Sequence, residues 1–254
     1  MTVRRQAELG ANLAAVRARI AAACGDVGRD PAEVTLIVVT KFFPASDVRL
    51  LSGLGVHDMG ESRDQEAGPK FAEVRADTSG LRLHFIGQVQ SNKAASVARY
   101  ADVVHTVDRP KLVAALERGA ERAGRALDVL VQVDLDRPDP TRSAPDGAQL
   151  PAEPGRPESH RGGVAPSDAL ELAEAVAACA HLRLAGVMAV APLHEDPDPA
   201  FARLARTAAA VRARFPDAVW ISAGMSGDLE AALRHGATHL RVGTAILGSR
   251  PPLR

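Results

Sequence analysis

The sequence predicts an α/β fold, a single (β/α)8 barrel of the TIM type preceded by an extra N-terminal helix. Short apolar segments typical of strands recur eight times between residues 34 and 242, and helical segments separate them. The chain has 254 residues, about the length of such a barrel. An open doubly wound sheet is the alternative if one of the two weakest strands is miscounted. We expect one domain over residues 1–254, with strands at 34–41, 56–59, 81–86, 102–105, 127–135, 182–190, 218–221 and 238–242.

The first predicted strand, residues 34–41, is almost entirely β-branched or aliphatic and ends on Lys41. Such a run is typical of a strand buried on both faces of a parallel sheet. A lysine at its end is either a solvated surface charge or an amine held there for its chemistry, since burial lowers a lysine's pKa and frees a nucleophile. The strand alone leaves both interpretations open.

Two segments lie outside the strand and helix alternation. An opening helix is predicted by a stripe of apolar residues at steps of three and four, namely Leu9, Leu13, Val16, Ile20 and Cys24. Residues 137–166 contain seven prolines and few large apolar side chains, so we expect a mobile loop insertion there. It follows the fifth strand, on the side where barrel sites are built, so it is either an inert insertion or a lid.

Composition restricts the partners. Thirty-one basic residues balance thirty-one acidic ones, so no overall charge favours nucleic acid or an anionic membrane. Cys24 and Cys179 lack the spacing of a metal site or a disulfide framework, and no apolar run reaches the length of a membrane span. We therefore expect a soluble, cytoplasmic, monomeric protein that binds no metal, nucleic acid or membrane.

Two segments near the C-terminus have the features of an anion site. Residues 222–226 (SAGMS) and 241–245 (RVGTA) follow the seventh and eighth strands, and each leads toward a helix start. Barrel closure sets the eighth strand beside the first, so this anion site would face Lys41. That pairing suits a ligand with both an aldehyde and a phosphate, which is pyridoxal 5′-phosphate (PLP). The alternative is a Schiff-base lyase of phosphorylated sugars, for which no obvious carboxylate pair lies beside Lys41, although Glu61 could serve.

Five stretches together resemble one known family: residues 36–41 (LIVVTK), 59–66 (MGESRDQE), 84–93 (HFIGQVQSNK), 222–226 (SAGMS) and 241–248 (RVGTAILG). They are similar to those of the pyridoxal phosphate homeostasis protein family, whose members resemble the barrel domain of alanine racemase without its second domain. The resemblance runs from the opening helix to Gly248, apart from the proline-rich insertion.

The resemblance implies PLP as the cofactor, held as a Schiff base on Lys41. Arg241 would face the pyridine nitrogen, where a cation disfavours protonation and weakens the ring as an electron sink. Ser62 stands where the family usually has asparagine, so its polar contact to the ring is expected to be shortened or lost. Ser222 and the backbone at Gly243 and Thr244 would hold the phosphate. The implied cofactor-binding residues are Lys41, Ser62, Ser222, Gly224, Met225, Ser226, Arg241, Gly243 and Thr244.

The implied function is intracellular PLP homeostasis, that is, buffering the cofactor or delivering it to PLP-dependent apoenzymes, without efficient catalysis and without catalytic residues. Racemisation needs a second base, which in alanine racemase is a tyrosine of the domain missing here. The single tyrosine, Tyr100, falls after the helix predicted behind the third strand, where we expect it to pack. A PLP-dependent amino-acid racemase remains the alternative.

The histidines have mainly structural interpretations. His57, His84 and His105 fall in or beside strands, where imidazoles are more often satisfied core or rim groups than catalysts. His235 and His239 are four residues apart, but Gly236 separates them into a helix end and a strand, so we expect no zinc site there.

Overall fold

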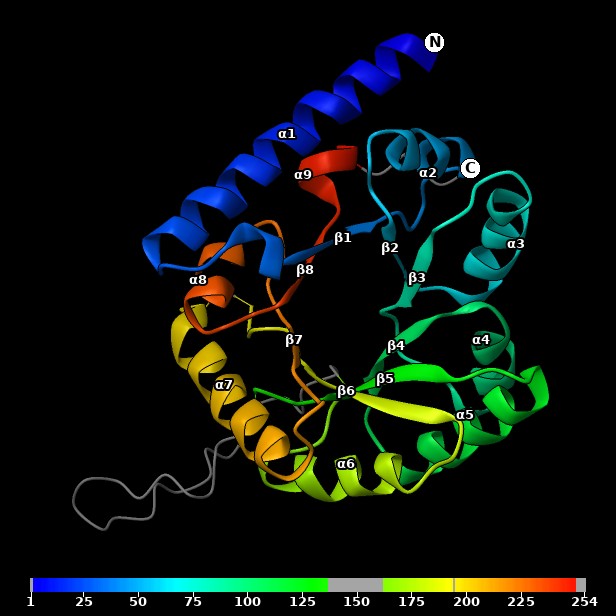
Figure 1. Ribbon diagram of the computed structural model, residues 1–254, viewed down its shortest axis with the longest axis vertical. Helices are drawn as coiled ribbons and strands as arrows, with labels where there is room; N and C mark the ends of the chain where they lie inside the picture. The colour runs from blue at the N-terminus through cyan, green and yellow to red at the C-terminus, as the bar shows by residue number, and fades with distance from the viewer. Residues whose placement is uncertain (1, 137–161, 194, 250–254) are drawn as a thin grey trace.

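Eight parallel strands close into a barrel, in sequence order from β1 to β8, and helices surround them (Figure 1). The computed structural model describes residues 2–136, 162–193 and 195–249. The barrel prediction is confirmed, and the open sheet was the wrong alternative because β1 pairs with β8. Most of the predicted loop insertion, residues 137–161, lies outside the described residues.

Each strand begins and ends within three residues of its predicted bounds. They are β1 (Thr35–Val39), β2 (Asp58–Glu61), β3 (Arg82–Phe85), β4 (Val103–Val107), β5 (Leu127–Gln132), β6 (Leu182–Met188), β7 (Trp220–Ser222) and β8 (His239–Val242). The helices are α1 (Thr2–Asp26), α2 (Ala45–Gly53), α3 (Asp64–Arg75), α4 (Ala94–Tyr100), α5 (Pro110–Ala123), α6 (Ala169–Ala177), α7 (Pro197–Arg214), α8 (Leu229–Arg234) and α9 (Thr244–Leu247), with 3-10 turns at Pro31–Glu33, Ser91–Lys93 and Pro166–Asp168.

The opening helix α1 lies outside the ring of the barrel and contacts α2, α8 and α9 (Figure 1). Its predicted apolar stripe is buried along its whole length, from Leu9 to Cys24. Asn12 donates to the carbonyl of Ile246, and Arg5 donates to that of Leu247. The helix therefore covers the seam where the last strand meets the first. None of the helices in the described parts of the chain is both long and apolar enough to cross a bilayer.

The interior of the barrel is unusually polar. The main apolar cluster takes its residues from both strands and surrounding helices, whereas a second cluster contains only Val103, Leu130, Ala185 and Met188, with Val190 and Trp220 packed against it. Alternate strand residues face the barrel interior. Among them, His84, His105, Ser222 and Arg241 are all nearly inaccessible to solvent. Because buried polar groups must find partners, hydrogen bonds rather than apolar contacts fill much of this space.

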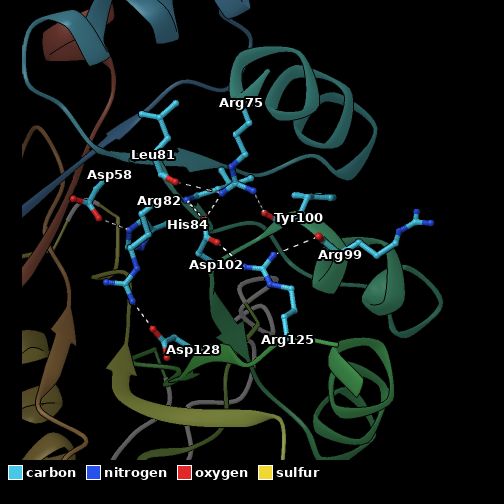
Figure 2. Close-up of polar contacts among 11 residues, drawn as sticks. Asp58, Arg75, Leu81, Arg82, His84, Arg99, Tyr100, Asp102, Arg125 and Asp128 are labelled. Carbon is cyan, nitrogen blue, oxygen red and sulfur yellow. Dashed lines mark hydrogen bonds and ion pairs between the residues drawn. The ribbon is translucent and has the colours of Figure 1, made fainter. Parts of the chain in front are cut away.

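Ion pairs connect the amino ends of β2 to β5, at the face opposite the carboxyl ends of the strands (Figure 2). Asp102 lies between Arg75 and Arg125, and its Oδ2 also accepts the Leu83 N–H at 2.7 Å. Asp128 binds Arg82, and it also accepts from Arg183 Nε at 2.8 Å. These ion pairs belong to the face that contributes to stability in barrels, since functional sites are built at the other end.

Gly87, two residues after the end of β3, packs against the backbone of Ser62, which follows β2. A Cβ at this position would lie 2.1 Å from the carbonyl oxygen of Ser62 and 2.7 Å from its carbonyl carbon. Gly10 is a matched contrast in α1, where a Cβ would meet only Leu54 Cδ2 at 3.7 Å.

Gly87→Ala should therefore destabilise the protein by more than about 2 kcal/mol, because backbone must move to admit the methyl group. Gly10→Ala should stabilise it by about 0.5–1 kcal/mol through helix propensity. Urea unfolding of the two variants measures both effects, and equal effects on the free energy of unfolding would contradict the predicted close approach at Gly87.

Candidate functional site

Lys41 lies in a tight turn after β1, and its side chain is half-buried. Phe43 N–H donates to the Thr40 carbonyl at 3.0 Å, which closes the turn and ends the strand before its predicted end. Phe42 has φ 71°, a left-handed conformation that non-glycine residues adopt at a cost. Its N–H donates to Glu66 Oε1 at 2.6 Å, so a carboxylate from α3 holds the turn that presents Lys41.

A buried ionic cluster underlies this turn. Lys70 Nζ lies 2.8 Å from Glu61 Oε1 and 2.8 Å from Glu66 Oε1, and it donates to the Thr40 carbonyl at 3.1 Å. Thr40 Oγ1 donates to Glu61 Oε1 at 2.7 Å. The sequence did not reveal this carboxylate pair, because its two members come from β2 and α3 and meet only through Lys70.

The Glu61 carboxyl is fully buried, and burial raises its pKa against the opposing effect of Lys70. Its second oxygen, Oε2, has no hydrogen-bond partner among the described residues. Oε1 is already engaged by Lys70 and Thr40. Glu61 is thus a structural group under the Lys41 turn, which weakens the sugar-lyase alternative that needed it as an acid or base.

Closure of the barrel brings the second glycine-rich segment to the Lys41 strand. Ile37 pairs with Arg241 in the β1–β8 register, and a Cβ on Gly243 would lie 3.2 Å from the carbonyl oxygen of Val39. Gly243 therefore allows the backbone to lie against β1, two residues before the Lys41 turn begins. Thr244 then starts α9, whose first N–H groups have no acceptor within the helix.

Arg241 is a buried cation on the inner face of β8. Nη1 donates to Ser222 Oγ at 2.7 Å, and Nη2 donates to the Ala189 carbonyl at 2.8 Å. Burial lowers the pKa of Arg241 to about 10, so it stays charged at neutral pH. Ser222 is itself fully buried, and its hydroxyl also lies 2.9 Å from His105 Nδ1. The predicted phosphate contact of Ser222 stays a prediction, but its hydroxyl is already shared by two neighbours.

The segment after β7 forms a turn rather than an immediate helix start. Gly224 has φ 92°, and a Cβ there would lie 2.7 Å from the Ala232 Cβ. Met225 N–H donates to Asp228 Oδ1 at 2.6 Å, and α8 begins only at Leu229. Ser226 lies in this turn and is half-buried. The helix start toward which this segment leads comes only at Leu229, because the Asp228 side chain ties the turn back onto Met225.

Ser62 follows β2 and lines a cavity of about 360 Å³ with residues that follow β3, including Gln88, Gln90 and Lys93. The polar residues of the 84–93 stretch thus lie at the same end of the barrel as Ser62. Lys41 does not line this cavity, so the structure does not by itself join Ser62 to the other predicted residues.

The remaining titratable groups lie elsewhere. Tyr100 ends α4, and its hydroxyl donates to Asp64 Oδ1 at 3.0 Å, while burial raises its pKa. His235 contacts Asp198, whereas His239 contacts Thr238. Over the described part of the chain, no group of three His, Cys, Asp or Glu side chains is arranged to hold a metal ion.

Removal of the Lys70 amine tests the cluster under Lys41. Lys70→Met should destabilise the protein by about 3–5 kcal/mol, because Glu61 is left buried without its cation. The loss of stability caused by Lys70→Met should be smaller near pH 5 than near pH 8. The pKa of Glu61 is higher in the native state than in the unfolded state, and it rises further when Lys70 is removed. The native state therefore binds the proton more tightly than the unfolded state does, so the free energy of unfolding falls as pH rises.

Urea unfolding at both pH values measures this effect. Arg49→Met is the matched control, because it breaks the exposed pairs with Glu73 and Asp77 and should have a much smaller effect that does not recover in acid. A pH-independent loss in Lys70→Met would contradict the role given to Glu61.

Comparisons with known proteins agree with this architecture. The family model for the alanine racemase N-terminal domain matches residues 158–251. The alanine racemase of Corynebacterium glutamicum has a TM-score of 0.65 at 16% identity, covering 98% of this chain and 63% of that chain. At that identity the likeness shows the fold alone.

Closer similarity comes from proteins that this chain covers over nearly their whole length. PipY of Synechococcus elongatus, in a structure with PLP bound, has a TM-score of 0.75 at 29% identity, covering 94% of this chain and 100% of that one. The pyridoxal phosphate homeostasis protein of Mycobacterium tuberculosis is 43% identical over 97% of this chain and 94% of its own length, and that of Escherichia coli is 34% identical over 96% and 97%. The chain belongs to the pyridoxal phosphate homeostasis protein family.

Proposed function

We propose that this protein binds PLP as a Schiff base on Lys41 and serves PLP homeostasis, as a carrier or buffer of the cofactor rather than as an efficient enzyme. One observation carries the proposal. The β1–β8 pairing sets a lysine turn, a close-packed glycine backbone and a buried arginine side by side at the carboxyl end of the barrel. A ligand with an aldehyde, a phosphate and a ring nitrogen requires three such groups: an amine for the aldehyde, backbone N–H groups for the phosphate and a side chain that faces the ring nitrogen.

The residues divide between these three tasks. PLP supplies an aldehyde, which condenses with a primary amine and releases water, and Lys41 provides that amine. The backbone at Gly243 and Thr244, with the 224–226 turn, is suited to the phosphate, because glycine admits close approach and helix-start N–H groups bind anions. Met225 and Ser226 belong to that turn, and Ser62 is assigned to the ring edge.

Arg241 is assigned to the ring nitrogen. A buried cation that keeps its charge near neutral pH disfavours protonation of a nitrogen in front of it. Ser222 has a second role in this proposal beside its predicted phosphate contact: because its hydroxyl accepts from Arg241 Nη1, it orients the guanidinium.

Weak catalysis follows from the same arrangement. An unprotonated ring is a poorer electron sink, and a racemase needs a base on each face of its substrate. The chain has one tyrosine, and Tyr100 lies on α4 with its hydroxyl bound to Asp64. The names of the relatives and the PLP bound in the PipY structure support a homeostatic role.

Lys41→Ala should abolish the yellow colour of the purified protein and the visible absorption band that PLP gives with the native chain. Borohydride reduction followed by peptide mapping should place the label on Lys41. Lys93→Ala is the matched control, since Lys93 lies at the same end of the barrel with its amine 3.8 Å from Asp64 Oδ2. A native protein that stays colourless with added PLP would contradict the proposal, and a label on Lys93 would move the site.

The PLP-loaded protein should leave the optical rotation of L-alanine unchanged over many turnover times of a typical racemase, because the second base is lacking. Polarimetry with L-alanine and other amino acids measures this. A sustained loss of rotation that disappears in Lys41→Ala would replace the carrier function by racemisation.

A further inference from the structure

A continuous chain of hydrogen bonds crosses the barrel interior from its amino end to Arg241. Asp58 Oδ1 lies 2.8 Å from His84 Nε2, His84 Nδ1 lies 2.9 Å from His105 Nε2, and His105 Nδ1 lies 2.9 Å from Ser222 Oγ. Ser222 Oγ is 2.7 Å from Arg241 Nη1. The five residues come from β2, β3, β4, β7 and β8, and Figure 2 shows the first contact of the chain, between Asp58 and His84.

The two ends of this chain fix the direction of every proton in it. An ionised carboxylate only accepts, so His84 donates from Nε2 and must accept at Nδ1. His105 therefore donates from Nε2 and accepts at Nδ1, where the Ser222 hydroxyl donates. Because that proton points away from Arg241, a lone pair of Ser222 is left for the guanidinium, which can only donate.

The charge states agree with this direction. Burial lowers the pKa of both His84 and His105, so both imidazoles are neutral near pH 7 and each has one donor and one acceptor nitrogen. Although burial acts to raise it, the hydrogen bond from His84 leaves the pKa of the Asp58 carboxyl lowered. Asp58 also lines a cavity of about 510 Å³ at the amino end of the barrel, where its charge is only partly shielded from solvent.

We propose that Asp58, His84 and His105 are positioning residues, which fix the Ser222 hydroxyl as an acceptor and thereby hold the Arg241 guanidinium toward the ring nitrogen of PLP. This inference rests on the proposed function. With the opposite tautomers, Ser222 would accept from both His105 and Arg241, and its own proton would point into a filled interior. The negative charge of Asp58 excludes these opposite tautomers, because an ionised carboxylate can only accept the hydrogen bond from His84.

Loss of the Asp58 charge tests the chain against a matched change. Asp58→Asn keeps the shape of the side chain but not its charge. Asp128→Asn makes the same change at the same end of the barrel, where Asp128 binds Arg82 (Figure 2) and Arg183 but not the histidines. Both variants should lose stability. Only Asp58→Asn should also shift the visible band of bound PLP and raise its Kd, on the order of three- to tenfold, as for one weakened buried hydrogen bond to a cation.

A double-mutant cycle shows whether the effect passes through Ser222. Ser222→Ala should shift the band in the same direction as Asp58→Asn, and adding Asp58→Asn to Ser222→Ala should cause no further shift. Additive shifts, or an Asp58→Asn spectrum like that of Asp128→Asn, would overturn the positioning role. A native protein without any PLP band would instead refute the proposed function.

The native protein offers a measurement that needs no variant. Long-range ¹H–¹⁵N NMR of the histidine rings should find His84 and His105 both neutral and both protonated at Nε2. A proton on Nδ1 of either ring, or a doubly protonated ring, would overturn the inference even if the Asp58 variant does not fold.

Discussion

The pairing of β1 with β8 is the constraint on which the site depends. The last strand can lie beside the first only if the sheet closes, and closure sets Ile37 opposite Arg241. Gly243 then lies against Val39, and α1 covers the seam through contacts with α8 and α9. Two segments about two hundred residues apart in the chain thus share one end of the barrel.

Closure also decides what the barrel interior must contain. A buried arginine has to be charged and bonded, so it brings acceptors with it. Ser222 and the Ala189 carbonyl supply two, and the Ser222 hydroxyl in turn needs His105. Each partner requires the next until the chain of hydrogen bonds reaches a group partly open to solvent, Asp58. The polar interior is therefore a consequence of placing one cation on the inner face of β8.

The sequence was sufficient to predict the number of strands, the apolar stripe of α1 and the residues that resemble the family, because each of these depends on local periodicity or on a short motif. Lys41 and Arg241 were predicted as cofactor-binding residues in this way, and their roles stay predictions. The sequence could not reveal the cluster of Glu61, Glu66 and Lys70, since a carboxylate pair from a strand and a helix depends on how the two pack. His84 and His105 were correctly expected to be satisfied core groups. Their connection to Ser222 depends on the register of four strands, which no local pattern encodes.

The two buried networks differ in what they can do for a ligand. The Lys70 cluster bonds the backbone on both sides of Lys41, through the Thr40 carbonyl and the Phe42 N–H, so it fixes where the amine is presented. The Asp58 chain bonds a side chain, Arg241, so it fixes where a positive charge points. Position of an amine governs whether a covalent bond can form, whereas the direction of a charge governs the electronic state of the ring that is bound. A carrier of PLP needs the first to hold the cofactor and the second to restrain its chemistry, and under the proposed function the two requirements fall to networks that share no residue.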